Sequence, residues 1–210
     1  LVNGDRGMIT PELVKSVISD PNFYHAPLTR MVSIENTTNK GGGACYEMDN
    51  LKAIKEVCIQ NNLIYHLDGA RLWNALVAKK QDPKEYGKLF DTISVCLSKG
   101  LGAPVGSVLL GTKAHIDRAI RVRKLFGGNM RQAGYLAAAG IYALDNNINR
   151  LEQDHRKAKE LAALLKTMPW VEKVEEVETN ILIFQLKKHI DEPKFMHLLK
   201  QKNILISSMG

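Results

Sequence analysis

The sequence predicts an α/β fold, in which a mostly parallel sheet flanked by helices is followed by a smaller α+β domain. Three observations lead to this fold class. Short apolar runs rich in β-branched and aromatic residues alternate with segments of helical spacing. Two of these runs, which lead to Asp68 and to Lys99, are separated by about the length of one βαβ unit. After about residue 149 the order changes to helix, two strands and helix. We therefore predict a large domain over 1–148 and a small domain over 149–210.

The first part of the chain is predicted to form a helix, a strand, a glycine-rich loop and a second helix. Thr10 is a plausible N-cap for a helix over Pro11–Ser19, because Pro11 would occupy the first turn. Met31–Asn36 is predicted to be a strand, and Asn36–Ala44, with three successive glycines, a loop. Apolar residues then recur at helical spacing, at Met48, Leu51, Ile54, Val57 and Cys58.

The middle of the chain is predicted to supply the centre of the sheet. The apolar run that begins at Leu63 is predicted to be a strand closed by Asp68–Gly69, with a helix to about Lys80. Thr92–Leu97 is predicted to be the next strand. Ser107–Gly111 follows too soon for a helical crossover, so we expect it to pair antiparallel.

The remaining elements complete both predicted domains. We expect helices over Lys113–Leu125, Met130–Asn146, Arg150–Met168 and Pro193–Lys202, strands over Val171–Val177 and Ile181–Leu186, and a last apolar strand at Ile204–Ile206.

A lysine that follows a buried strand and enters a glycine-rich turn carries the strongest chemical signal. Lys99 occupies this position, and burial there would free its amine as a nucleophile. Asp68 ends the preceding strand, and Arg71 follows one turn later. Since parallel strands end at the same sheet edge, these side chains are expected to lie close together. A lysine for a Schiff base and a carboxylate for a ring nitrogen are what a pyridine aldehyde cofactor needs.

Each of these residues also has a structural interpretation. Lys99 could end a strand and extend into water, Asp68 could stabilise a turn or cap a helix, and Arg71 could form a weak surface ion pair.

Three segments resemble the motifs of low-specificity L-threonine aldolases, of the β-eliminating lyase/threonine aldolase family. They are His66–Arg71, Ser98–Ser107 and Gly127–Gly134, and the resemblance runs from about Gly4 to the end of the chain. It implies the fold of aspartate aminotransferase, known as fold type I, with the cofactor pyridoxal 5'-phosphate (PLP) in the large domain. It also implies cleavage of L-threonine or L-allo-threonine to glycine and acetaldehyde.

The resemblance implies a role for each of four residues around the cofactor. Lys99 is the catalytic residue that forms the Schiff base, and Asp68 keeps the ring nitrogen protonated. Arg71 contacts the ring oxygen or the substrate carboxylate, and Ser98 contacts the phosphate.

Three further residues match family positions near the substrate or a neighbouring subunit's site. They are Lys124, Arg131 and Thr38, and the family usually has a histidine where this chain has Thr38. A threonine hydroxyl does not titrate near neutrality, so this difference affects the substrate-hydroxyl step. His66 is read as structural. The resemblance also implies a homo-oligomer, either a dimer or a homotetramer. Because the chain begins at Leu1, and family members extend past both of its ends, we also expect it to be incomplete at both ends.

Composition excludes several other classes of protein. The three cysteines form no CxxC pair, which favours reduced thiols in the cytoplasm. We expect no metal, no membrane partner and no nucleic acid, although the net charge is +7 and basic residues gather between Arg118 and Arg131. The alternatives left open are β-elimination or transamination on the same scaffold, and a non-catalytic relative of such enzymes.

Overall fold

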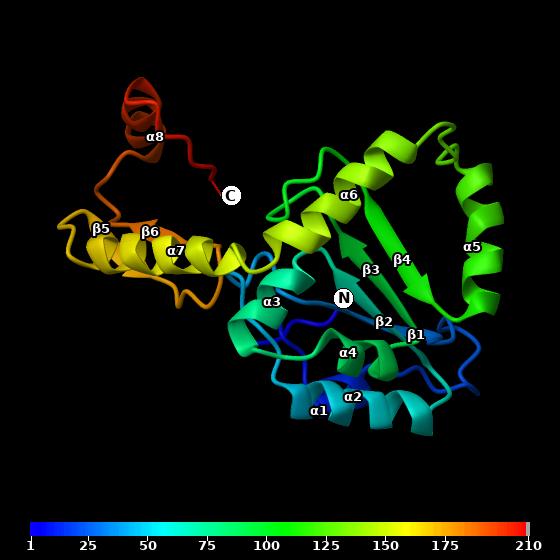
Figure 1. Cartoon of the computed structure of the whole chain (residues 1–210). Helices are drawn as coiled ribbons and strands as arrows, with labels where there is room; N and C mark the ends of the chain where they lie inside the picture. Colours follow the sequence, from blue (N-terminus) through cyan, green and yellow to red (C-terminus); the bar gives the residue numbers. More distant parts are fainter. Residues whose placement is uncertain (209–210) are drawn as a thin grey trace.

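The main sheet has four strands, which lie side by side in the order in which they occur along the chain (Figure 1). They are β1 (Met31–Glu35), β2 (Ile64–Gly69), β3 (Thr92–Cys96) and β4 (Ser107–Gly111). The structure is a computed structural model that describes residues 1–208. The first three strands are parallel, and β4 returns antiparallel to β3. Both the mostly parallel sheet and its antiparallel neighbour are therefore confirmed.

One face of this sheet packs against α1 (Pro11–Ser16), α2 (Met48–Gln60) and α4 (Pro83–Leu89), which lie together below the sheet in Figure 1. Thr10 accepts a hydrogen bond from the backbone N–H of Leu13, so it caps α1 as predicted. Every second strand residue faces this core, namely Val32, Ile34, Tyr65, Leu67, Ile93 and Val95. This alternation is the period of a strand with one buried face.

The alternate residues of the same strands are half-buried or exposed. They include His66 and Asp68 on β2 and Ser94 and Cys96 on β3. The sheet thus has an apolar face and a polar face, and Asp68 belongs to the polar one.

Three further helices precede residue 148, namely α3 (Leu72–Lys79), α5 (Lys113–Leu125) and α6 (Gly134–Asn147). The bounds predicted for α5 are confirmed, but α6 begins four residues later than predicted. The end of α6 packs with the loop that follows β3, in a second apolar cluster that contains Leu101, Ala103, Ala143 and Leu151. In contrast, α5 has no buried residue.

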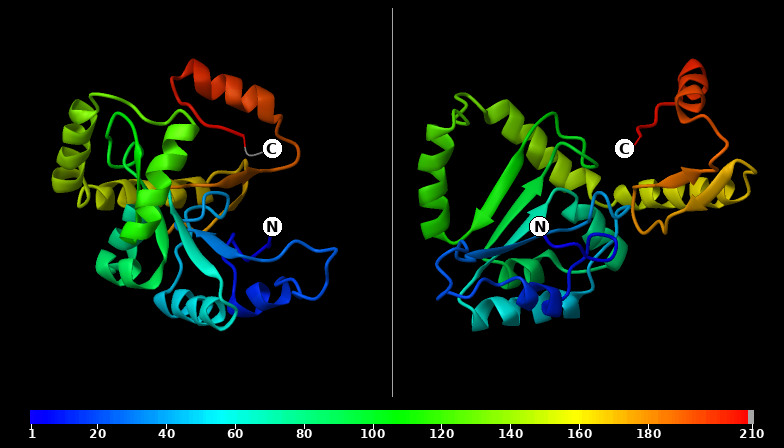
Figure 2. Two further views of the ribbon diagram at one scale, coloured as in Figure 1. Left: turned by 90° about the vertical axis from the view of Figure 1, so that its right-hand side faces the viewer. Right: turned by 180° about the vertical axis from the view of Figure 1, so that it is seen from behind.

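The last third of the chain contains α7 (Leu151–Lys166), β5 (Val171–Val174), β6 (Phe184–Leu186) and α8 (Glu192–Gln201). Figure 2 shows this part beside the main sheet, and β5 and β6 pair only with each other, antiparallel. The predicted order of helix, two strands and helix is confirmed. The strand expected at 204–206 is wrong, because these residues have no strand partner; residues 209–210 lie outside the described residues. The division at 148/149 stays a prediction.

Helix α4 was not predicted from the sequence. Its signals are present in the sequence, because Asp82 precedes Pro83 and Glu85 follows in the first turn. In the structure, the Asp82 carboxylate accepts a hydrogen bond from the backbone N–H of Lys84 at 2.8 Å.

Candidate active site

Two neighbouring parallel strands bring the proposed cofactor residues to one edge of the sheet. Asp68 pairs in register with Ser94, and Gly69 pairs with Val95. A Cβ on Gly69 would lie 2.6 Å from the carbonyl oxygen of Ser94, so the close approach of β2 and β3 requires a glycine after Asp68. The carboxyl ends of β2 and β3 therefore meet as predicted.

The turn that carries Lys99 is fixed by backbone hydrogen bonds. The N–H of Gly102 donates to the carbonyl of Lys99 at 2.9 Å, and the N–H of Ala103 donates to that of Leu97 at 3.1 Å. Leu101 is 2% exposed, which anchors the far side of the turn in the second apolar cluster.

The expectation of a buried Lys99 amine is wrong for this chain. β3 ends at Cys96, and the turn then carries Ser98 and Lys99 out of the sheet, so both residues are exposed.

The Lys99 turn lies beside α3, which Arg71 precedes as its N-cap residue, because Trp73 and Val77 of this helix pack against the apolar cluster that contains Leu101. A Cβ on Gly100 would lie 3.5 Å from Nδ2 of Asn74, one turn after Arg71. The structure thus gathers Asp68, Arg71, Ser98 and Lys99 around the ends of β2 and β3.

The polar atoms of these four residues are largely free to bind a ligand. Oδ1 of Asp68 accepts one hydrogen bond from the N–H of Ala70 at 3.0 Å, and the Ser98 hydroxyl lies 3.7 Å from Sγ of Cys96. Within residues 1–208, neither Asp68, Arg71 nor Lys99 forms an ion pair. An amine, a carboxylate, a guanidinium and a hydroxyl suit an aldehyde, a ring nitrogen and an anionic group, so this donor set fits PLP.

Thr38 follows β1 at the same edge of the sheet, but its hydroxyl is already used. Thr38 is 2% exposed, and its Oγ1 donates to the carbonyl of Arg6 at 2.9 Å. The neighbouring Oγ1 of Thr37 is buried and has no hydrogen-bond partner within the described chain. The side chain of Thr38 therefore closes a loop and does not project from it as a free donor.

The structure does not bring Lys124 and Arg131 to the ends of β2 and β3, where Asp68 and Lys99 lie. Lys124 lies in the last turn of α5, and Arg131 lies in the segment between α5 and α6. Both residues are exposed, and α5 contacts β4, so β3 and β4 stand between this helix and Asp68 (Figure 1).

The cysteines and His66 agree with structural roles. None of the three cysteines forms a disulfide, and burial raises the pKa of the Cys45 thiol to about 12 and that of Cys58 to about 11. Nδ1 of His66 lies 2.8 Å from Oγ1 of Thr92 on the neighbouring strand, which links β2 to β3.

Sequence reasoning missed one buried polar pair, Asn74 on α3 and His155 on α7. The signal was a polar residue within an apolar stripe, because Leu151, Ala158 and Ala162 share the buried side of α7 with His155. Nothing in the sequence pairs two residues that are 81 positions apart.

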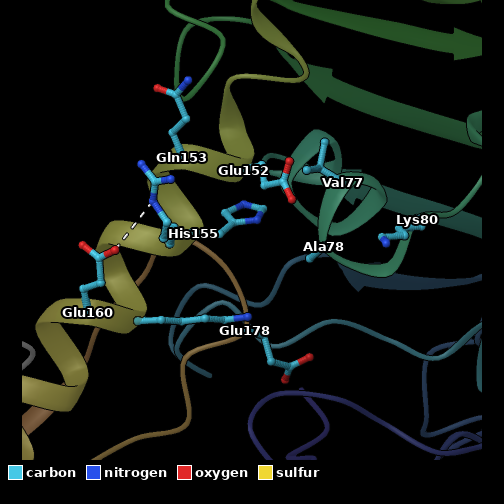
Figure 3. Close-up of a pocket in the computed structure, with 10 residues that line it drawn as sticks. Val77, Ala78, Lys80, Glu152, Gln153, His155, Glu160 and Glu178 are labelled. Carbon is cyan, nitrogen blue, oxygen red and sulfur yellow. Dashed lines mark ion pairs between the residues drawn. The ribbon is translucent and has the colours of Figure 1, made fainter.

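A cavity of about 450 Å³ lies between α3 and α7, and its lining includes Val77, Lys80, Glu152 and His155 (Figure 3). Asp68 and Lys99 do not line it, so it is separate from the proposed cofactor site.

Residues 1–208 contain neither a cluster of metal-ligating side chains nor a membrane-spanning helix. No group of three or more histidine, cysteine, aspartate or glutamate side chains in this range is arranged to hold a metal ion. None of its helices has the length and apolar character needed to cross a membrane.

Comparisons with known proteins place the chain in a family. The profile of the family described as beta-eliminating lyase matches residues 1–189. Low specificity L-threonine aldolase of Escherichia coli K12 is 42% identical over 188 residues, covering 90% of this chain and 55% of the relative. Low-specificity L-threonine aldolase 1 of Arabidopsis thaliana is 38% identical over 210 residues, covering 97% and 58%.

A solved structure agrees with the fold. The threonine aldolase of Leishmania major has a TM-score of 0.76 at 20% identity, over 96% of this chain and 57% of that one. The chain therefore spans somewhat more than half the length of the relatives it matches. With a profile match over most of its length, the chain belongs to the beta-eliminating lyase family, in which low-specificity L-threonine aldolases are its relatives.

Proposed function

We propose that the protein of which this chain forms at least a part is a PLP-dependent lyase that cleaves L-threonine and L-allo-threonine to glycine and acetaldehyde. The observation that carries this proposal is the placement of Asp68 and Lys99 at the adjacent ends of two parallel strands, with free polar atoms. The identity of 42% with a low specificity L-threonine aldolase supports the choice of reaction.

Four residues would hold the cofactor. Lys99 would bond to its aldehyde carbon, and Asp68 would hold the ring nitrogen in its protonated form. Ser98 would donate to the phosphate, and Arg71 would donate to the ring oxygen or to the substrate carboxylate. When bound, the cofactor withdraws electrons from the α-carbon of an amino acid, which weakens the bond between Cα and Cβ.

The residues of this chain set the polarity of that site. The Asp68 carboxylate is fixed in direction by the N–H of Ala70, so one oxygen stays free for a ring N–H. Arg71 is the N-cap residue of α3, and its guanidinium can bind a carboxylate with two parallel hydrogen bonds. Thr38 cannot accept the proton of the substrate hydroxyl, because its own hydroxyl donates to Arg6 and does not titrate near neutrality.

We further propose that the protein is a homo-oligomer. Large apolar side chains are exposed on β4, on α5 and in the following segment, among them Leu109, Leu110, Leu125, Phe126 and Met130. Such a surface is typical of a protein interface. Lys124 and Arg131 lie on this side of the molecule, so in an oligomer they could serve a neighbouring subunit's site. The three free thiols support a cytoplasmic location.

The proposed reaction is tested by replacing Lys99 in the complete protein. Lys99→Ala removes the only amine proposed to bond the cofactor, so we expect threonine cleavage to fall by at least about a thousandfold. We also expect borohydride to fix no cofactor on the protein. Lys188→Ala, at another exposed lysine, is the matched control and retains both properties. Cleavage by Lys99→Ala at the normal rate would refute the proposal.

The family name also includes β-elimination, so the products decide the type of reaction. Glycine with acetaldehyde supports the aldolase assignment, whereas pyruvate with ammonia supports an eliminating enzyme on the same residues.

A further inference from the structure

The turn that carries Lys99 packs against helices from two distant parts of the chain. A Cβ on Gly100 would lie 2.7 Å from Cδ2 of Leu151, the first residue of α7. At the end of α6, Nδ2 of Asn147 donates to the carbonyl of Leu101 at 2.7 Å. The position of this turn therefore depends on where α6 and α7 lie.

Asn74 and His155 join α3 to α7 beside the same turn. Nε2 of His155 donates to Oδ1 of Asn74 at 2.9 Å, and the two residues are 5% and 2% exposed. Figure 3 shows His155 projecting from α7 toward α3, next to Val77 and Ala78. Two polar side chains buried at this depth cost free energy unless they are bonded to each other.

The hydrogen bond also fixes the orientation of the Asn74 amide. Since the amide oxygen faces His155, the amide nitrogen faces Gly100, 3.5 Å from where a Cβ of that residue would lie. Burial lowers the pKa of His155, which favours the neutral imidazole, and the acceptor Oδ1 of Asn74 selects the tautomer with the proton on Nε2.

We propose that His155 is a positioning residue for Lys99, acting through Asn74 on the turn that begins at Ser98. By joining α3 to α7, whose Leu151 packs closely over Gly100, it holds the turn in the orientation that the lyase reaction uses; this inference rests on the proposed function. It assigns a role in the reaction to a helix of the smaller domain, more than 50 residues beyond the lysine along the chain.

Two substitutions of His155 in the complete protein separate positioning from simple packing. His155→Phe keeps a ring of similar size and removes the donor. His155→Gln keeps an N–H at a similar reach, so it can still donate to Asn74. His197→Phe is the matched control, because His197 is exposed on α8 and distant in sequence from the turn.

The first readout is hydrogen exchange of the Gly102 and Ala103 amides in the cofactor-free protein, since these N–H groups close the Lys99 turn. We expect His155→Phe to speed their exchange by about tenfold or more, and His155→Gln to restore it. The second readout is threonine kinetics, where His155→Phe is expected to lower kcat about tenfold with KM changed less than about threefold.

Equal exchange at Gly102 and Ala103 in wild type and His155→Phe would overturn the positioning role, as would equal losses in His155→Phe and His155→Gln. If His155→Phe fails to fold, Asn74→Ala replaces it, because this variant removes the amide and keeps the imidazole. The exchange readout needs neither cofactor nor substrate. A wild-type protein that does not cleave threonine would therefore refute the proposed function and leave the exchange result to decide on His155.

Discussion

His155 is a buried imidazole whose protonation is linked to the stability of the fold. Burial first, and the nearby charge of Lys159 second, lower its pKa from the ordinary value of 6.5. Asp154 and Glu152 oppose this shift, and Lys80 and Glu178 also line the cavity beside the ring. The unfolded chain therefore binds a proton at His155 at a higher pH than the folded chain does.

This difference predicts how stability depends on pH. As the pH falls through 6.5, the unfolded state gains the proton first, so the free energy of unfolding decreases. The decrease ends when the pH passes below the lowered pKa of the folded state. Urea denaturation between about pH 8 and about pH 5 should show a steeper loss for wild type than for His155→Gln, which has no titrating group there. Parallel curves for the two proteins would contradict the prediction.

At the scale of single residues, the sequence identifies the chemical groups of the proposed site, but it does not show their burial or their hydrogen-bond partners. The residues around the ends of β2 and β3 could be named because Asp68 and Lys99 each follow an apolar run. The exposure of Lys99 could not be predicted from the sequence, because the burial of a turn depends on which distant segments cover it. Likewise, no local pattern shows that the hydroxyl of Thr38 donates to Arg6, which lies 32 positions away.

Among the elements, α2 illustrates how a helix depends on its buried side. Ile54 is fully buried in the main core, whereas Ile59 of the same helix is 59% exposed. Ile54→Ala is expected to lower the free energy of unfolding by about 2–5 kcal/mol, because it leaves a cavity. Ile59→Ala should change it by about 0.5 kcal/mol or less. Urea denaturation of both variants is the measurement, and equal losses would show that α2 does not pack as described.

Elements were predictable where a periodic pattern and an end signal coincide. Thr112 caps α5, and the predicted helix Lys113–Leu125 has the observed bounds. α4 was missed because its seven residues contain few apolar positions, so its signals were limited to Asp82, Pro83 and Glu85 at its start. The strands β5 and β6 are shorter than their apolar runs, since strand length depends on the partner strand as well as on composition.

On the scale of the whole molecule, an ionic network ties the loop between β5 and β6 to the first part of the chain. The Glu178 carboxylate lies 2.8 Å from the guanidinium of Arg6 and 3.2 Å from the ammonium of Lys79. Lys79 also pairs with Glu47 at 2.6 Å, and the side chains of Arg6 and Glu178 are about one-fifth exposed. Four segments that are far apart in sequence are therefore linked by this network, with Glu178 bonded to two of the others.

Removal of this carboxylate should loosen that junction. Glu178→Gln leaves two partly buried cations with a weaker partner, so we expect a loss of about 2 kcal/mol in the free energy of unfolding. Glu160→Gln is the control, because its pair with Arg156 is 3.6 Å apart and both side chains are about two-thirds exposed. That variant should lose less than about 0.5 kcal/mol. Equal stability of Glu178→Gln and wild type in urea would contradict the prediction.

The reversed direction of β4 has a consequence for the route of the chain. β4 starts opposite Cys96, near Lys99, and ends opposite Thr92, at the other end of the sheet. The chain is thereby carried away from Lys99, and α5 and α6 must bring it back until Asn147 reaches Leu101 (Figure 1). This return path brings the first turn of α7 to the Lys99 loop, so the direction of a single strand places α7 beside the proposed cofactor site.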